Sequence, residues 1–536
     1  MRIALALLFL AIAIRLDGQV PAGTGFERAE ATIRGRVLLS DGRPVSRAQL
    51  RLTGGLAPVR YAITSDDGSY EFAHLLSGSY RLLASKTGYL SLEFGQRDSA
   101  DPGQVITVAA GETRARVDII LPRHGAIAGR ITDEGGDPID GARVHVFQIR
   151  FAAGRRRLVP VGGAYAVRTN DLGRYRVFGL QPGRYFLRAE AGAVGTGQLP
   201  GYGGTYFPGT PNPSEAQVVT VGVSEEVANV DVALTLSRTA RVSGVTLDAT
   251  GEPFQGRILM RPSRRSTSVA VDEVGARTSS DGRFEFPNVE PGEYVIDTAR
   301  GNDHALQFVS VNGVDLTGLV LQTTAGSTIS GRVVFEGGEP LNRRNILLSA
   351  VAVDPDLAPF GDDTRTTGVG LDSRFDFSHV VGPRRLHVSQ TPTGWALKSI
   401  LVDGVVATDH VFPFGSSDQS LKNVEVVLTN TITEISGTVA DRRTPATQGA
   451  VVVFAADRGR WYDESRYLAV AQVRDGRFTV RGLPPDEYLV AAVERLPGAA
   501  ADKQWQDPEF LMALGGRASR LILNEGEKVS IELSSR

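Results

Sequence analysis

Histidine and acidic residues are the natural starting point for catalytic or metal chemistry in this chain of 536 residues. A zinc hydrolase draws imidazole and carboxylate ligands from local pairs such as His-x-x-Glu or His-Glu-x-x-His. None of the seven histidines is followed by Glu three positions later, and no His-Glu-x-x-His or Gly-x-Ser-x-Gly motif occurs. Phosphate loops and dinucleotide fingerprints are absent as well. We therefore expect a protein that is not an enzyme and that uses no cofactor and no metal.

Acidic residues recur in one kind of turn, in which Asp66-Asp67, Asp281 and Asp475 stand directly before a glycine. An oxygen-rich turn can bind calcium. Asp-Gly also makes a turn by itself, because Gly accepts a positive φ and Asp bonds to its own backbone. No third or fourth acid recurs beside these residues, so the turn interpretation is preferred.

Aromatic residues gather in two segments that are candidates for ligand binding. The Gly/Pro-rich stretch 201–213 contains Tyr202, Tyr206 and Phe207, and a second segment contains Trp461 and Tyr462. Flat aromatic faces stack on sugar rings or hold a peptide, and they also bury well against a protein core. We predict these five residues as ligand-binding candidates, with burial against the fold as the alternative.

Arginine supplies two short basic runs, Arg155 to Arg157 and Arg264-Arg265. Short charged runs usually mark solvated loops, and anion binding is the alternative. The formal net charge of the whole chain is -2. No overall field therefore favours nucleic acid, which we exclude as a partner.

The N-terminus has the features of an export signal. Arg2 precedes an apolar run from Ile3 to Ile14, which is shorter than the roughly 20 residues that a spanning helix needs. We expect cleavage near residue 19, with an uncleaved anchor as the alternative, and no later membrane span. The chain has no cysteine and hence no disulfides. We expect an exported bacterial protein of the periplasm, the cell surface or the medium.

The elements that position these residues repeat about every hundred residues. Each unit begins with an alternating strand that has a glycine in its middle: Gly35, Gly129, Gly244, Gly331 and Gly437. A mid-strand glycine costs roughly 0.5–1 kcal/mol relative to Ala. Close backbone approach or a bulge at these positions would explain it.

A second motif, clearest over residues 280–296, follows in every unit and reads as strand, turn and strand. Phe284 and Phe286 alternate with polar residues between an Asp-Gly turn and the Pro291-Gly292 turn, which predicts a hairpin with one apolar face. If Phe284 lies in a core, Phe284→Ala should destabilise its domain by roughly 3–5 kcal/mol. Calorimetry that shows no change in melting would mean that this face is misassigned.

One helix is predicted near the C-terminus. Asp507 is a capping residue, Pro508 fits the first helical position, and Gly515-Gly516 ends the helix. We expect this helix to plug the end of the last unit.

The Gly-Arg-Val start, the Asp-Gly-x-Phe-x-Phe turn and the Pro-Gly-x-Tyr strand resemble the carboxypeptidase regulatory-like domain, a transthyretin-like sandwich grouped with carbohydrate-binding-like folds and Cna B-type repeats. The resemblance implies an all-β chain of about five tandem Greek-key β-sandwiches arranged like beads on a string. The expected limits are 1–19 for the signal peptide and 30–123, 124–237, 238–324, 325–431 and 432–536 for the sandwiches.

The resemblance also bears on function, because members of this family are mostly non-catalytic modules of exported bacterial proteins. Some Cna B-type domains form a Lys–Asn bond, but Arg36, Arg130 and Arg332 occupy the early strands here. We expect a non-enzymatic envelope protein with a structural spacer, adhesion or ligand-binding role and a polysaccharide or an envelope protein as partner. The alternatives are a carbohydrate-binding protein that uses the loop aromatics, and an accessory subunit of a peptidase or outer-membrane transporter.

Overall fold

A computed structural model describes most of the chain after the predicted signal peptide (1–19), which lies outside the described residues. The described residues are 30–54, 58–97, 103–152, 154–161, 167–191, 201–263, 274–301, 303–340, 345–359, 361, 364–414, 419–441, 444–445, 449–498 and 502–534. No helix within these ranges is long and apolar enough to cross a membrane.

The predicted all-β fold of tandem sandwiches is confirmed, because the strands form pairs of sheets that enclose separate hydrophobic cores. We number the sandwiches 1 to 5 by their cores, which span 31–121, 127–234, 240–321, 329–428 and 435–533. We propose to keep the domain limits expected above, which place one core in each unit.

Sandwiches 1 and 2 each contain a sheet with the glycine-bearing strand and a second sheet opposite it. The first sheet of sandwich 1 consists of β1 (Ala31–Leu38), β4 (Ser69–Leu75), β8 (Thr113–Arg114) and β9 (Ile119–Ile120), and the second of β2 (Gln49–Gly54), β3 (Arg60–Ile63), β5 (Gly78–Ser85), β6 (Leu92–Glu93) and β7 (Ile106–Val108). The first sheet of sandwich 2 consists of β10 (Gly125–Thr132), β14 (Arg174–Leu180), β18 (Glu226–Val227) and β19 (Val232–Ala233), and the second of β11 (Arg143–Ala152), β12 (Arg155–Pro160), β13 (Val167–Arg168), β15 (Gly183–Ala191), β16 (Gly201–Tyr206), β17 (Val219–Val221) and β20 (Leu236–Ser237).

Sandwiches 3 to 5 follow the same plan. Sandwich 3 pairs β21 (Ala240–Leu247), β24 (Arg283–Val289) and β27 (Leu316–Gln322) in one sheet, and β22 (Arg257–Pro262), β23 (Val274–Arg277), β25 (Gly292–Arg300) and β26 (Asp303–Val311) in the other. Sandwich 4 pairs β28 (Ser327–Glu336), β31 (Arg374–Val380), β33 (Ala396–Val402), β34 (Val405–Val406) and β36 (Ser420–Thr429), and opposite them β29 (Leu347–Ala352), β30 (Thr364–Gly368), β32 (Gly382–Gln390) and β35 (Val411–Phe414). Sandwich 5 pairs β37 (Glu434–Asp441), β38 (Thr444–Pro445), β41 (Arg477–Arg481) and β44 (Lys528–Ser534), and opposite them β39 (Ala450–Ala455), β40 (Leu468–Gln472), β42 (Asp486–Val493) and β43 (Ser519–Leu523).

The short helices lie in connections between strands. Within the residues that the structure describes, the α-helix is α1 (Pro508–Gly515), and the 3-10 turns are η1 (Pro213–Glu215), η3 (Pro355–Leu357), η4 (Arg458–Arg460) and η6 (Gln504–Gln506).

The predicted hairpin is a corner between the two sheets, so that part of the prediction was wrong. In sandwich 3, β24 pairs with β21, whereas β25 pairs with β22 in the opposite sheet. The alternation was read correctly, because Phe284 and Phe286 are buried in the core of sandwich 3. Alternation reports which face of a strand is apolar, and it does not report which strand is its hydrogen-bonded neighbour.

The mid-strand glycines allow the closing strand of each unit to approach closely, as expected. A Cβ at Gly129 would lie 2.0 Å from the carbonyl oxygen of Val230, and one at Gly331 would lie 2.0 Å from that of Val424. The residue before each of these carbonyls, Asn229 or Asn423, has a positive φ. The closing strand therefore bulges toward the glycine, and only a residue without a side chain fits there.

The predicted helix α1 begins and ends where the sequence indicated. The Asp507 side chain accepts a hydrogen bond from the backbone N–H of Glu509, and Pro508 occupies the first turn. The helix covers the outer face of the β39–β42 sheet with Leu511 and Leu514, so the expected place at the end of the sandwich was wrong. This second layer explains why every residue of β39 is buried.

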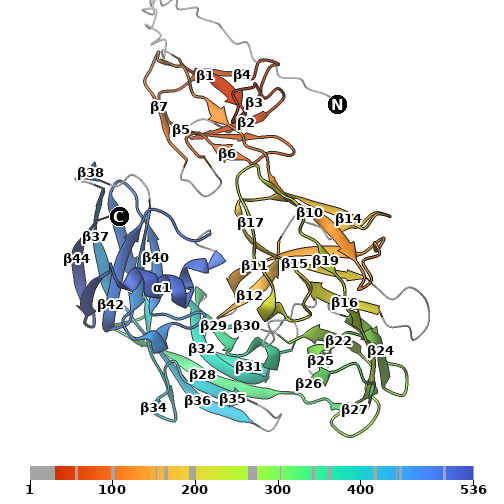
Figure 1. Cartoon of the computed structure of the whole chain (residues 1–536). Coiled ribbons are helices and arrows are strands. Elements are labelled where there is room, and N and C mark those ends of the chain that lie inside the picture. The colour runs from red at the N-terminus through yellow and green to blue at the C-terminus, as the bar shows by residue number, and fades with distance from the viewer. Residues whose placement is uncertain are drawn as a thin grey trace, which may run out of the picture.

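The sandwiches follow one another along the chain, but the last four do not form an open string. Figure 1 shows sandwiches 2 to 5 arranged around a closed path, with sandwich 5 (blue) beside sandwich 2 (orange to yellow) and sandwich 1 (red) projecting from the group. Contacts between β11 and η6 close this path. The beads-on-a-string description therefore applies to the order of the domains and not to their arrangement.

Candidate binding site between sandwiches 2, 4 and 5

The first contact between sandwiches 5 and 2 is made by the side-chain amide of Gln504, which binds the backbone of strand β11. The Nε2 of Gln504 donates to the carbonyl oxygen of Phe151 at 2.7 Å, and the N–H of Phe151 donates to Oε1 of Gln504 at 3.0 Å. A side-chain amide carries both a donor and an acceptor, so it can pair with β11 as a neighbouring strand would. Gln504 lies in η6 of sandwich 5 and is separated from Phe151 by 353 positions in the sequence.

An ion-pair group lies beside this amide contact. Arg156 on β12 donates from Nε to Oδ2 of Asp507 at 2.7 Å, and its Nη1 lies 2.5 Å from Oε1 of Glu509. Asp507 thus caps α1 with one oxygen and binds sandwich 2 with the other. We call these five residues, Phe151, Arg156, Gln504, Asp507 and Glu509, the clasp.

The junction between sandwiches 2 and 3 contains a buried arginine. The Nη2 of Arg188 on β15 lies 2.6 Å from Oε2 of Glu290, and its Nη1 pairs with Glu190. Burial by itself raises the pKa of Glu190, but the neighbouring His145 imidazole and Arg188 guanidinium outweigh it and lower the pKa to about 2. Glu190 is therefore held in its ionised form at this junction.

The junction between sandwiches 3 and 4 is also ionic and buried. Arg261 on β22 lies 2.8 Å from Oδ1 of Asp356 in η3 and 3.1 Å from Oδ2 of Asp297. Ser263 donates to the second oxygen of Asp356 at 2.7 Å. Removal of one partner from a buried pair costs roughly 3–5 kcal/mol, so this network orients the two sandwiches specifically.

The junction between sandwiches 4 and 5 centres on Asp409. Its Oδ2 lies 3.1 Å from Nη2 of Arg466 and accepts a hydrogen bond from the hydroxyl of Tyr467 at 3.1 Å. The guanidinium of Arg385 lies 3.7 Å from the centre of the Tyr462 ring. Both sandwiches therefore contribute polar groups to one half-buried cluster.

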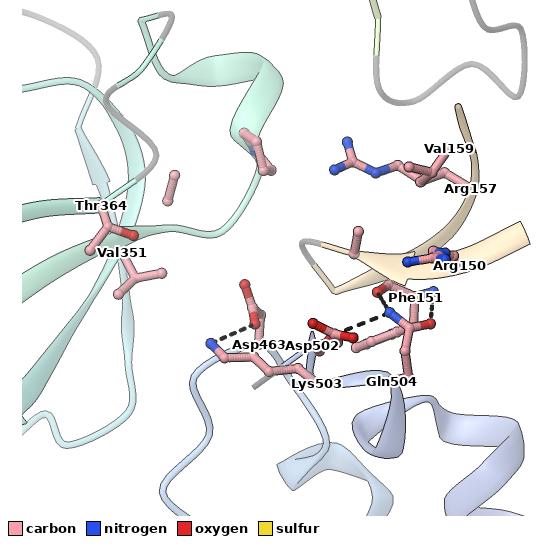
Figure 2. A pocket seen from close by; sticks show the side chains of 13 residues that line it. Arg150, Phe151, Arg157, Val159, Val351, Thr364, Asp463, Asp502, Lys503 and Gln504 are labelled. Atoms are coloured by element: carbon pink, nitrogen blue, oxygen red, sulfur yellow. Dashed lines mark hydrogen bonds and ion pairs between the residues drawn. The ribbon is translucent and has the colours of Figure 1, made fainter. Parts of the chain in front are cut away.

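A cavity of about 480 Å³ lies where sandwiches 2, 4 and 5 meet. Figure 2 shows its lining side chains arriving from three separate parts of the chain around one open space. Sandwich 2 contributes Arg150 and Arg157, sandwich 4 contributes Val351, and sandwich 5 contributes Asp463 and Lys503. Ligand pockets typically have volumes of about 300–1,000 Å³ and occur preferentially between domains.

Charged side chains reach the cavity from sandwiches 2 and 5, and apolar side chains reach it from sandwich 4. In Figure 2 the guanidinium of Arg157 extends from β12 into the space, and Asp463 and Lys503 lie on the sandwich 5 side. The Nζ of Lys503 pairs with Glu464 and lies 3.9 Å from Oδ1 of Asp463. Val351 and Pro355 of sandwich 4 form the apolar side. This arrangement can hold a small polar molecule by charge, hydrogen bonds and one apolar face.

Two further hollows repeat around the mid-strand glycines. One of about 1080 Å³ lies over Gly331 in sandwich 4, and one of about 740 Å³ lies over Gly35 in sandwich 1. Each is confined to a single sandwich. The cavity between three sandwiches is the stronger candidate because its walls come from three domains.

The loop aromatics of sandwich 2 pack onto their own domain. Tyr206 is only 2% exposed, and Tyr202 and Phe207 are half-buried against the same core. The strand β16, which carries Tyr202 and Tyr206, pairs with β15. Tyr206 therefore offers no open ring face to a sugar, which corrects its predicted role. For Tyr202 and Phe207, a contact with a ligand stays a prediction.

The second aromatic pair also has neighbours within the protein. Trp461 donates from Nε1 to the carbonyl oxygen of Ala455 at 2.8 Å, and its ring meets Phe454 edge-on at 5.6 Å between centroids. Tyr462 lies under Arg385, and burial raises its pKa to about 12. Ligand binding by this pair stays a prediction as well.

The first basic run is a strand and not a solvated loop. Arg155 and Arg156 are exposed on β12, Arg156 belongs to the clasp, and Arg157 lines the cavity. The second run, Arg264-Arg265, lies outside the described residues. The sequence carried a signal for the second layer over sandwich 5, because β39 is apolar at every position, which indicates burial of both faces.

In the Asp-Gly turns, the Asp carboxylate accepts hydrogen bonds from residues of the same turn. Oδ1 of Asp67 accepts hydrogen bonds from the hydroxyl of Ser65 at 2.7 Å and the N–H of Ser69 at 3.1 Å. These bonds lower the pKa of Asp67 to about 2. Asp281 makes the same pattern with Ser279 and Arg283, so the turn interpretation describes this geometry.

The fold and the cavity together define the class of this chain. It is an all-β protein of tandem sandwiches in which the last sandwich contacts the second. Comparison with protein families shows that residues 32–122, which form sandwich 1, match the carboxypeptidase regulatory-like domain. The chain therefore contains a carboxypeptidase regulatory-like domain. No curated protein matches the chain in sequence.

Several solved structures are similar to parts of this chain. The TIE protein of Bacillus anthracis is 10% identical, with 77% of this chain and 74% of that chain covered and a TM-score of 0.17. A streptococcal ancillary pilin is 13% identical, with coverages of 55% and 98% and a TM-score of 0.20. The minor pilin GBS52 of Streptococcus agalactiae is 16% identical, with coverages of 39% and 96% and a TM-score of 0.23. Scores this low carry no argument about function.

Proposed function

We propose that this chain is a non-enzymatic, exported bacterial envelope protein whose tandem sandwiches serve a structural or adhesion role. The observation that carries the proposal is the clasp. It joins sandwich 5 to sandwich 2 and turns four sandwiches into one compact base, from which sandwich 1 projects (Figure 1). Such a base supports the display of a domain better than it supports the extension of a flexible spacer.

The projecting sandwich has an exposed apolar strand edge that suits adhesion. Tyr61 and Ile63 lie on β3 and are 73% and 66% exposed. β3 is the terminal strand of its sheet, so its outer backbone groups are available for pairing with a further strand. The partner expected from this chemistry is an extended segment of an envelope protein.

Retention on isolated envelopes tests this proposal. The purified chain should sediment with washed envelopes of the source cells, and Tyr61→Ser with Ile63→Ser should reduce that retention at least about threefold. Ile120→Ser is the matched control, since Ile120 is an exposed apolar residue on β9, in the other sheet of the same sandwich. Fractionation of native cells that recovers the protein in the cytoplasm would refute the proposal.

A further inference from the structure

We propose that the open edge of β3 in sandwich 1 binds an extended acidic segment, that is, a strand in which apolar residues alternate with polar ones and one polar position is Glu or Asp. Because this is the edge for which we proposed adhesion, the assignment of an acidic partner rests on that role. Three features of the edge select the partner. They are the direction of its backbone groups, a row of apolar side chains, and an arginine that has no carboxylate partner among the described residues.

The free backbone groups of β3 belong to the residues with exposed side chains. β3 pairs with β2, and directly after it the N–H of Thr64 donates to the carbonyl oxygen of Ala48 at 3.0 Å. The direction of hydrogen bonding alternates along an antiparallel strand, so Ala62 bonds toward β2, whereas Tyr61 and Ile63 direct their N–H and C=O groups toward the open edge. A partner strand added to β3 therefore forms its hydrogen bonds with Tyr61 and Ile63.

Exposed apolar side chains form a row on one face of this edge. Val59, Tyr61 and Ile63 occupy alternate positions and are 48%, 73% and 66% exposed. Residues of a partner strand that lie opposite Tyr61 and Ile63 point to the same face. Aromatic and β-branched side chains pair favourably across strands, so β-branched residues at alternate positions of the partner would cover this row.

The other face of the edge carries a guanidinium that lacks an acidic partner. Arg60 donates from Nη1 to the carbonyl oxygens of Ala73 at 2.5 Å and His74 at 3.4 Å, both on β4. Among the described residues no carboxylate lies within ion-pair distance of Arg60, and the carboxylate of Glu30 pairs with His74. A guanidinium has five N–H donors. Arg60 therefore keeps donors for a carboxylate that a partner strand brings between its apolar residues.

The charges along the edge place the acidic position of the partner near Arg60. β2 and β3 contain two charged residues, Arg51 and Arg60, and no acidic residue. The acidic residues Asp66 and Asp67 follow beyond Ile63, where Asp67 accepts hydrogen bonds within its own turn. A carboxylate of the partner is favoured at the Arg60 end and disfavoured at the Ile63 end, because like charges repel across neighbouring strands.

Fluorescence anisotropy of the full chain with short labelled peptides tests the proposal. The peptides alternate Val with Thr, and one central Thr is replaced by Glu, Gln or Lys. We expect the Glu peptide to bind at least about threefold more tightly than the Gln peptide, and the Lys peptide to bind most weakly. Tyr61→Ser with Ile63→Ser should weaken the binding of all three. Hydrogen exchange should show that the bound Glu peptide protects the backbone amides of β3.

Substitution of Arg60 tests the source of the preference. Arg60→Gln should remove the preference for the Glu peptide, whereas Arg60→Lys, which keeps the charge, should retain it. Arg114→Gln is the matched control, because Arg114 is exposed on β8, at the opposite edge of the first sheet from β4, and it should leave the preference unchanged. Arg60 also joins β3 to β4, so the ranking of the three peptides in the parent chain tests the proposal even if the variants of Arg60 do not fold.

No binding or equal binding of the three peptides, an unchanged preference in a folded Arg60→Gln variant, or protection of a strand other than β3 would overturn the proposal. Retention on envelopes tests the adhesion role separately. If Tyr61→Ser with Ile63→Ser lowers retention but the peptides bind equally, the acidic partner is wrong and the adhesion role stands. If the peptides rank as expected but envelopes do not retain the parent chain, the adhesion role is wrong and the preference for acidic segments stands.

Discussion

A buried tyrosine closes the corner between the two sheets in four of the five sandwiches. Each hydroxyl donates to the carbonyl oxygen four residues earlier, in the pairs Tyr80–Leu76, Tyr185–Gln181, Tyr294–Glu290 and Tyr488–Pro484. In sandwich 4 the position belongs to Arg384, which is 0% exposed and donates to the carbonyl oxygens of Val381 at 2.8 Å and Ala350 at 3.1 Å. The corner requires a buried donor, and two different side chains supply it.

The mid-strand glycines allow a direct test of close approach within one sandwich. Gly331→Ala should destabilise sandwich 4 by roughly 1–3 kcal/mol or more, because the new Cβ would meet the carbonyl oxygen of Val424 at 2.0 Å. Gly368→Ala is the matched control, since the nearest atom to its Cβ is 4.0 Å away. Urea unfolding followed by tryptophan fluorescence measures both. Equal midpoints for the two variants would contradict the close approach.

Glu190 should make the junction between sandwiches 2 and 3 sensitive to acid. Its folded pKa of about 2 lies below the usual 4.5, so its contribution is complete above about pH 5 and is lost as the pH falls toward 2. The loss amounts to roughly 3 kcal/mol. Urea midpoints at pH 7 and pH 3 should differ less in Glu190→Gln than in the parent chain. An identical pH dependence in both proteins would show that the junction does not hold Glu190 ionised.

Among the secondary-structure elements, α1 has limits that are set by nearby residues, whereas its position depends on contacts with distant strands. Its cap and its end are set by Asp507 and by Gly515-Gly516. Its place over β39 and β42 depends on an apolar outer sheet face that sandwich 5 presents. The same helix start then supplies Asp507 to the clasp, so one short element serves both a domain and an interface.

Truncation of the helix contact should destabilise sandwich 5. Leu511 is fully buried on the face of α1 that packs on the sheet. Leu511→Ala should lower the free energy of unfolding by roughly 2–5 kcal/mol. Met512→Ala is the control, since Met512 is an exposed neighbour on the same helix and should change stability by about 0.5 kcal/mol or less. If both substitutions have the same effect in calorimetry, α1 does not pack on the sheet.

In the whole molecule, the closed contact between sandwiches 2 and 5 decides which surfaces are available. It buries the inner sides of the base, forms the cavity and leaves sandwich 1 outside (Figure 1). Each junction described among sandwiches 2 to 5 uses an arginine with carboxylate partners, namely Arg188, Arg261, Arg466 and, in the clasp, Arg156. Arginine pairs of this kind fix relative orientation through their planar geometry.

A disulfide offers a specific test of closure, because the chain has no cysteine of its own. A Cβ at Gly154 would lie 3.6 Å from the Cβ of Asp463, which is within the range for a disulfide. The double variant Gly154→Cys and Asp463→Cys should therefore form an intramolecular bridge between sandwiches 2 and 5. Faster migration on a non-reducing gel would show it. The single variants should migrate as the parent does, and recovery of free thiols in the oxidised double variant would disprove the contact.

Several features followed from the sequence alone. The repeat of about one hundred residues, the alternating strands, the buried Phe284 and Phe286 and the limits of α1 all depend on interactions within a few residues or within one unit. Local turn chemistry and the alternation of apolar residues carry that information. The mid-strand glycines also indicated close approach of another backbone segment, because a position that accepts only glycine has no room for a side chain.

The tertiary structure alone decided the rest. Alternation did not reveal that the two halves of the corner belong to different sheets. The run Arg155 to Arg157 read as a loop because it is charged at consecutive positions, although it forms a strand that pairs with β11. The contact between Arg156 and Asp507 spans 351 residues. Its formation depends on the angles at three successive junctions, where arginine–carboxylate contacts join the sandwiches. The cavity exists only where sandwiches 2, 4 and 5 meet, so no segment of the chain encodes it by itself.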